Sequence, residues 1–161
     1  MSDMLVKLYN IPTDFSFLAD MEKIGVIVRK PIGPEKHAIV DWVREHFSDP
    51  WASEMDISMS GFPPTSWIAT YKKELIGFSC FDSTCLGLFG PMGVHPDHRK
   101  KGIGKALLMA CLVEMKLKGY AYCIIGSVGP TDFYVKTCGA TIIEDSEPSV
   151  WYDMLRRKKR N

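Results

Sequence analysis

The stretch VHPDHRKKGIGKALL, residues 94–108, combines two glycines with a run of basic side chains at the start of a helix. The whole chain is nearly neutral, with 20 Lys and Arg against 19 Asp and Glu, so this positive charge is local. A helix start leaves backbone N–H groups unpaired and carries about half a positive charge, which attracts anions. Gly102 and Gly104 leave the backbone accessible to a phosphate. We therefore expect this turn to bind a pyrophosphate.

The elements on either side of this turn support the same expectation. Residues 99–118 form the best-defined helix, because their apolar positions follow the helical period. These positions are Ile103, Ala106, Leu107, Ala110, Val113 and Leu117. Residues 86–94 are apolar like a strand, but Gly90, Pro91 and Gly93 weaken strand pairing and predict a bulge or a close approach by a ligand. Leu107 replaces the third glycine of a dinucleotide fingerprint, and no Walker loop is present.

The remaining patterns predict a mixed α/β (α+β) fold with the order β-α-α-β-β-β-α-β-α-β-β. The two helices after the first strand begin near Gly33-Pro34 and at Ser48-Asp49-Pro50. The expected strands are 24–30, 67–71, 75–81, 86–94, 120–125, 140–144 and 150–155, and a short helix covers 131–138. Before residue 24, weak patterns indicate a short strand at 5–9 and a helical turn or two at 15–21.

Composition indicates one soluble domain, with 46% hydrophobic and 24% charged residues in 161. The five cysteines show no metal-type spacing, and His95 and His98 have no further ligand nearby in sequence, so we expect neither disulfides nor a metal. No leader and no long apolar run is present, which favours a cytoplasmic protein. A net charge of +1 argues against nucleic-acid and membrane partners. The basic end, Arg156–Arg160, is expected to be a solvated tail rather than a binding patch.

The opening stretch resembles motif A of the Gcn5-related N-acetyltransferase (GNAT) family. That motif, V-x-P-x-x-[RQ]-x-x-G-x-[GA], is met at Val94, Pro96, Arg99, Gly102 and Gly104. The order of elements from residue 24 to the end also resembles the family. The resemblance implies an acyl-CoA N-acyltransferase fold, with residues 1–23 as an N-terminal extension and 24–161 as the acetyltransferase domain. It also implies acetyl-CoA, and hence coenzyme A binding, as the cofactor.

The resemblance further implies roles for particular residues. The pyrophosphate of coenzyme A would be held by the backbone of Arg99, Lys100, Lys101, Gly102, Ile103, Gly104 and Lys105. Met92 and Val94 would pair with the pantetheine arm, and an amide near Met92 would stabilise the oxyanion. Tyr134 would protonate the departing thiolate, since a phenol with a pKa near 10 and a thiol near 8.5 are closely matched.

The proton acceptor for the amine is left open by the sequence, because residues 86–94 contain no titratable side chain. Glu54, Asp56, Asp82 and a water relay all remain candidates. The leading function is an acyltransferase that moves acetyl to a primary amine by direct attack, because no cysteine marks a covalent intermediate. A non-catalytic acyl-CoA sensor and a nucleic-acid-binding module are the alternatives. The acceptor is not indicated, and nothing decides between a monomer and the homodimer common in this family.

Overall fold

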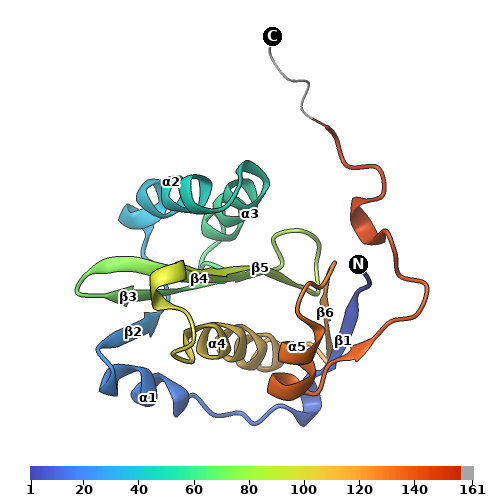
Figure 1. Cartoon of the computed structure of the whole chain (residues 1–161), viewed down its shortest axis with the longest axis horizontal. Helices are drawn as coiled ribbons and strands as arrows, with labels where there is room; N and C mark the ends of the chain where they lie inside the picture. The colour runs from blue at the N-terminus through green and yellow to red at the C-terminus, as the bar shows by residue number, and fades with distance from the viewer. Residues whose placement is uncertain (157–161) are drawn as a thin grey trace.

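The computed structural model describes residues 1–156, which contain one mixed sheet of seven strands (Figure 1). The strand order is β2-β3-β4-β5-β6-β1-β7, and only β5 and β6 are parallel neighbours. The strands are β1 (Met4–Lys7), β2 (Val26–Arg29), β3 (Ser66–Tyr71), β4 (Glu74–Phe81), β5 (Leu88–Val94), β6 (Tyr122–Ile125) and β7 (Thr141–Ile142). The mixed α/β architecture is therefore confirmed. Of the predicted basic tail, all but Arg156 lies outside the described residues.

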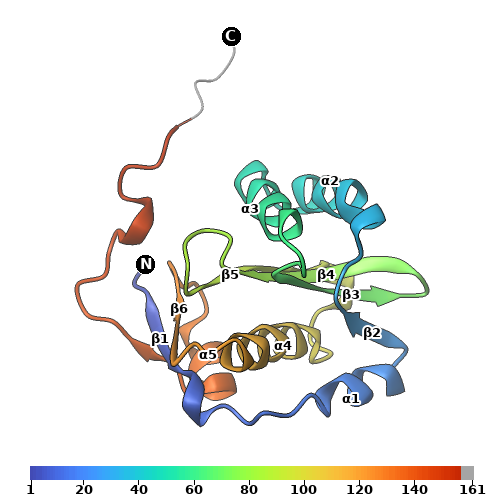
Figure 2. The ribbon, with the colours of Figure 1, turned by 180° about the vertical axis from the view of Figure 1, so that it is seen from behind.

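Helices cover both faces of this sheet (Figures 1 and 2). The helices are α1 (Phe17–Lys23), α2 (Lys36–His46), α3 (Asp49–Ser60), α4 (Ile103–Leu117) and α5 (Thr131–Cys138), with 3-10 turns η1 (Leu8–Asn10), η2 (Gly33–Glu35), η3 (Pro96–His98) and η4 (Ser149–Trp151). The pair α2 and α3 lies on one face, whereas α4 lies on the other with α1 beneath it. Each face encloses its own apolar core.

Helix α4 is buried on more sides than its periodic pattern predicts. Besides the expected face, Leu108, Cys111, Leu112 and Met115 are fully buried, while Leu117 is 60% exposed. The second cover comes from the N-terminal segment, which runs beneath the helix in Figure 1. Lys116 Nζ of α4 donates a hydrogen bond to the Ile11 carbonyl of this segment, and the Phe15 ring stacks on Trp67 of β3. Residues 8–23 thus shield the side of α4 that the sheet leaves open.

The end of the sheet differs from the sequence prediction. The predicted last strand at 150–155 is wrong, because this segment forms the turn η4 and an irregular stretch. The place beside β6 is occupied by β1, which pairs along its whole length from Met4↔Ile125 to Lys7↔Tyr122. On its other edge β1 pairs with β7. Both edges of β1 are therefore satisfied, and the C-terminal segment finds no free strand edge there.

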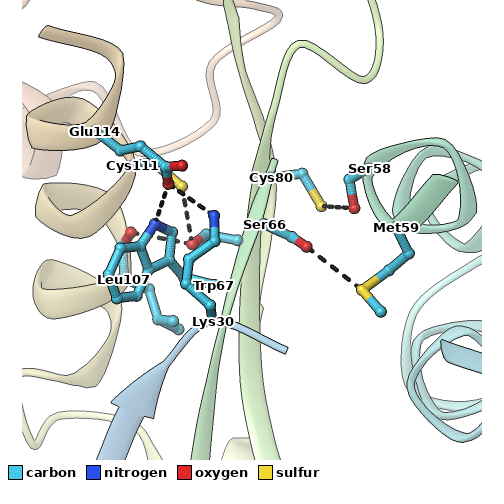
Figure 3. Close-up of polar contacts among 10 residues, drawn as sticks. Lys30, Ser58, Met59, Ser66, Trp67, Cys80, Leu107, Cys111 and Glu114 are labelled. Carbon is cyan, nitrogen blue, oxygen red and sulfur yellow. Dashed lines mark hydrogen bonds and ion pairs between the residues drawn. The ribbon is translucent and has the colours of Figure 1, made fainter. Parts of the chain in front are cut away.

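Polar contacts fix helices to both faces of the sheet (Figure 3). On one face, the Glu114 carboxylate of α4 accepts hydrogen bonds from Trp67 Nε1 at 2.6 Å and Lys30 Nζ at 2.8 Å. On the other face, Cys80 Sγ lies 3.6 Å from Ser58 Oγ of α3. Charge-assisted hydrogen bonds such as those of Glu114 are stronger than neutral ones. They hold α4 in register with β3, which sets the position of its N-terminus.

Candidate active site

Strand β5 pairs with β6 only over its first two residues. The two strands pair only at Leu88↔Ile124 and Phe89↔Ile125, after which no β6 residue pairs with β5. On the other side, the register with β4 shifts between Ser79 and Phe81, opposite the Gly90-Pro91 step. Gly90 takes a φ of +115°, which favours glycine. The predicted bulge is confirmed, and it opens a gap in the sheet.

The free edge of β5 presents alternate backbone groups to this gap. The His95 N–H donates to the Ile76 carbonyl of β4 at 2.8 Å. Because strand residues alternate in direction, Gly93 also faces β4, whereas Met92 and Val94 face the gap. The Val94 carbonyl accepts a hydrogen bond from Arg99 Nε at 3.1 Å. These are the two residues that the sequence predicted to present backbone groups to a ligand.

The N-terminus of α4 opens next to this edge without a side-chain cap. Gly102 precedes the first helical residue with a φ of +82°, a left-handed conformation that favours glycine, and no side chain caps the helix. Its carbonyl accepts the first helical hydrogen bond, from the Ala106 N–H at 3.0 Å. The earlier amides, from Ile103 to Lys105, have no place in the helical ladder. They form the positive end of a 15-residue helix and suit an anionic group.

The gap and the helix terminus belong to one open cleft of about 2260 Å³. Nine of the ten residues predicted from the sequence line it: Met92, Val94, Arg99, Lys100, Gly102, Ile103, Gly104, Lys105 and Tyr134. Lys101 is not among the lining residues. It borders a separate small hollow with Ile24, Val26 and Tyr71. The structure therefore brings the loop, the strand edge and the tyrosine together around one space.

Two glycines of this cleft have different physical explanations. A Cβ atom on Gly93 would lie 2.4 Å from the Phe47 ring, so packing alone requires glycine there. A Cβ atom on Gly104 would meet nothing closer than Val94 Cγ2 at 3.9 Å, which is an ordinary contact. Packing within the protein therefore does not require Gly104. A ligand lying close against the helix N-terminus does explain a small residue at this position.

Tyr134 lies in the wall of the cleft on α5. Its side chain is 9% exposed and its ring meets Phe133 edge-on at 5.0 Å. Its hydroxyl has no hydrogen-bond partner among the described residues, and no buried side-chain oxygen or nitrogen in them lacks a partner. The oxygen is therefore accessible to solvent, and Tyr134 is one of the residues that line the cleft. Burial raises the pKa of Tyr134 to about 12, so the hydroxyl is protonated at neutral pH and can donate a proton.

The three carboxylates considered from the sequence have different surroundings, and two of them are structural. Asp82 accepts a hydrogen bond from the Tyr120 hydroxyl at 2.6 Å, and this bond raises the pKa of Tyr120 to about 12. Asp56 forms an exposed ion pair with Lys36 at 2.7 Å, which lowers the pKa of the Asp56 carboxyl. Neither carboxylate lines the cleft.

Glu54 is the third of these carboxylates, and it does line the cleft. It lies half-buried on α3, where its Oε1 accepts a hydrogen bond from the Thr84 hydroxyl at 2.5 Å. Burial raises the pKa of the Glu54 carboxyl, and the Thr84 bond offsets this only in part. Cys85, next to Thr84, is exposed and also lines the cleft.

The C-terminal segment forms a wall of the cleft that the sequence did not predict. A Cβ atom on Gly126 would lie 2.4 Å from the Trp151 ring, so that ring covers the backbone where β6 ends. Asp3 holds this arrangement from the other end of the chain. Its carboxylate accepts hydrogen bonds from the Ser127 N–H at 2.8 Å and the Ser149 hydroxyl at 2.6 Å. No local pattern marks such a contact, because its partners are far apart in sequence.

Residues 1–156 contain neither a cluster of metal ligands nor a helix suited to a membrane. No three His, Cys, Asp or Glu side chains in this part of the chain could hold a metal ion together. His95 and His98 lie with their rings 6.1 Å apart, and His46 approaches His95 at 5.2 Å. Within the same residues, no helix is both long and apolar enough to cross a bilayer.

Three solved structures of similar fold are distant from the chain in sequence. One is the glucosamine N-acetyltransferase region of a fungal multi-domain GH3 β-N-acetylglucosaminidase (TM-score 0.71, 16% identity, 88% of this chain and 19% of that chain). A GCN5-related N-acetyltransferase from Sphaerobacter thermophilus has a TM-score of 0.63 at 18% identity, covering 88% of this chain and 48% of that chain. A GCN5-related N-acetyltransferase from Kribbella flavida has a TM-score of 0.60 at 12% identity, covering 88% of this chain and 53% of that chain. The chain therefore spans about half or less of these proteins, and the likeness shows the fold.

The family is shown by sequence as well as by fold. No curated protein sequence matches the chain significantly. The sequence model of the acetyltransferase (GNAT) family matches residues 36–140, which include α2 to α5 and the whole uncapped turn. This match covers more than half of the chain. The protein belongs to the GNAT family of acetyltransferases, whose members use acetyl-CoA as the acetyl donor.

Proposed function

We propose that this protein transfers an acetyl group from acetyl-CoA to a primary amine by direct attack within a ternary complex. One observation carries the proposal: an uncapped helix N-terminus, a free strand edge and a tyrosine whose hydroxyl bonds no described residue line one cleft. The amides of residues 103–105 would hold the pyrophosphate, and the backbone of Met92 and Val94 would pair with the pantetheine arm. This arrangement would place the thioester beside β5, with the Met92 amide near the developing oxyanion.

The chain's own groups can handle the protons of this reaction. The amine nitrogen forms a bond to the acetyl carbon, and the bond from that carbon to sulfur breaks. Tyr134 would give its proton to the leaving thiolate and recover one from the nitrogen of the product. Because burial raises the pKa of Tyr134 to about 12, the hydroxyl stays protonated throughout the neutral range. The same desolvated surroundings raise the proton affinity of the thiolate, which favours the transfer.

The order of the steps can be tested by kinetics together with one cysteine variant. Direct attack predicts intersecting double-reciprocal lines when acetyl-CoA and an amine are varied, and no labelled protein after incubation with radioactive acetyl-CoA alone. Cys85 is the cysteine in the cleft, so Cys85→Ser should keep full turnover. Parallel double-reciprocal lines would instead show a covalent intermediate, provided that the wild-type protein carries the acetyl label and Cys85→Ser does not. Tight acetyl-CoA binding without turnover on any amine would favour the sensor function.

Tyr134→Phe should lower kcat by about 100-fold and leave the dissociation constant of acetyl-CoA unchanged. General acids contribute about 100-fold or more to the rate, and phenylalanine keeps the ring but removes the proton donor. Calorimetry would give the affinity, and release of free coenzyme A thiol would give the rate. Full activity in Tyr134→Phe would remove the tyrosine from the mechanism.

A further inference from the structure

Glu54 is a half-buried carboxylate without a cation. Its hydrogen bond comes from a neutral hydroxyl, that of Thr84, and none of the ion pairs among residues 1–156 includes it. Taking a carboxylate out of water is unfavourable unless a cation or several donors compensate. The other carboxylate at this end of α3, Asp49, lies 3.3 Å from Arg44 Nε. The structure therefore leaves Glu54 suited to a positive charge supplied from outside.

Hydrogen bonds place Glu54 beside the bulge of β5. Thr84, which donates to Glu54, follows Ser83, whose hydroxyl donates to the Gly90 carbonyl at 3.2 Å. This chain of contacts connects the carboxylate to the point where β5 leaves β6. Met92, the expected oxyanion donor, lies two residues further along the same strand. Glu54 thus borders the part of the cleft where the acetyl group would lie.

The walls around Glu54 are largely apolar. One turn to either side on α3, Trp51 and Ile57 line the cleft, and Ile57 is 55% exposed. Phe47, stacked on Trp51 at 5.3 Å, also lines the cleft. Arg44 and Asp49 also line the cleft here, but they pair with each other, so among these residues Glu54 is the charged side chain without an ion pair. Such a surface complements a ligand with one ammonium group and an apolar body.

We infer that Glu54 and the apolar face of α3 form the acceptor site, which takes a primary ammonium on an apolar, aromatic-sized body and passes its proton to Glu54. This inference rests on the proposed function and names its substrate class. The ammonium gives one proton to the carboxylate, which leaves a neutral amine and a neutral Glu54. The amine then attacks the thioester, and Glu54 returns the proton to solvent after product release.

The expected acceptor can be tested with 2-phenylethylamine and spermidine. The first has one ammonium on an aromatic body, whereas the second is a polycation without a ring. The wild-type protein should acetylate 2-phenylethylamine with a kcat/KM about tenfold or more above that for spermidine, because only its ring buries apolar area. A preference for spermidine would overturn the acceptor class while leaving acetyl transfer intact. Failure to bind acetyl-CoA by calorimetry would instead overturn the proposed function and this inference with it.

Glu54→Gln should lower kcat/KM for 2-phenylethylamine at pH 7 by about 30-fold and leave acetyl-CoA affinity unchanged. The deficit should shrink as the pH rises towards about 10, near the pKa of the amine, because free amine needs no base. The group that contacts Glu54 is the neutral Thr84 hydroxyl. Burial raises the pKa of the nearby Cys80 thiol of β4 to about 12, so this thiol is protonated. Cys85 also lines the cleft, as do Arg44 and Asp49, which pair with each other. A deficit equal at every pH, or none, would overturn the role.

Glu45→Gln is the matched control, because Glu45 is an exposed glutamate on α2 that does not line the cleft. It should behave like the wild type in every assay. Thermal unfolding gives a second readout that a structural glutamate would not show. Burial raises the pKa of Glu54, so its charged form destabilises the fold above that pKa. Glu54→Gln should therefore raise Tm by about 2–4 °C at pH 7.5, with a smaller gain at pH 4.5. A lowered Tm at pH 7.5 would indicate a structural role.

Discussion

Gly104→Val should weaken acetyl-CoA binding by at least about 100-fold while the protein stays folded. The added side chain would occupy the space against the amides of α4 where the pyrophosphate is expected. Losing two hydrogen bonds to a charged phosphate, at about 1.5–3 kcal/mol each, gives an effect of this size. A Cβ atom at this position has 3.9 Å to its nearest neighbour, Val94 Cγ2, so the fold itself accepts it. Calorimetric titration with acetyl-CoA measures the loss.

Two control variants separate loss of the site from loss of the fold. Gly104→Ala adds only the Cβ atom, and the family motif allows alanine here, so its affinity should stay within a few-fold of the wild type. Gly33→Val places the same valine where the structure leaves open space far from the cleft lining. Both controls and Gly104→Val should melt at similar temperatures, since valine suits a helix better than glycine by a few tenths of a kcal/mol. Unchanged affinity in Gly104→Val would reject the loop as the pyrophosphate site.

The turn at residues 94–108 could be predicted because its properties are local. A left-handed glycine before the helix, the lack of a cap and the bulge in β5 all follow from neighbouring residues. Helix α5 was predicted with the observed bounds, Thr131–Cys138, for the same reason. Glu54 could not be singled out from neighbouring residues in the same way. Its burial depends on Thr84, which lies 30 residues away, so the sequence offered it only as one of three carboxylates.

The two ends of the chain show where local patterns are insufficient. Residues 150–155 are apolar enough for a strand, but strand formation needs a free edge, and β1 already occupies the edge of β6. Residues 1–23, expected to be an extension, contribute β1 to the sheet and cover α4. Neither outcome can be read from periodicity, because it depends on which of two segments pairs first with a distant strand. Asp3 makes several of the contacts that join both ends.

Asp3→Ala should therefore lower the free energy of unfolding by about 3–4 kcal/mol, which corresponds to a Tm lower by roughly 6–16 °C. The variant removes a buried carboxylate that accepts two hydrogen bonds, from the Ser127 N–H at 2.8 Å and the Ser149 hydroxyl at 2.6 Å. Hydrogen bonds to charged groups contribute about 1.5–3 kcal/mol each, and the Ser127 amide would lose its acceptor. Denaturant unfolding measures the difference.

The effect should be concentrated at one side of the cleft. Without the Asp3 carboxylate, the segment that carries Trp151 loses the hydrogen bond of Ser149 but keeps the backbone bond from the Ile143 N–H to the Asp3 carbonyl. Amide hydrogen exchange should therefore quicken in residues 144–152 and at Ser127, but not in α4. Asp3→Asn keeps one acceptor oxygen and should lose about half as much stability as Asp3→Ala. Because the pyrophosphate site lies on α4, acetyl-CoA affinity should change little in either variant. If protection from hydrogen exchange were instead lost equally throughout the sheet and α4, β1 would be needed for the whole core. The C-terminal wall would then not be a separately stabilised part of the cleft.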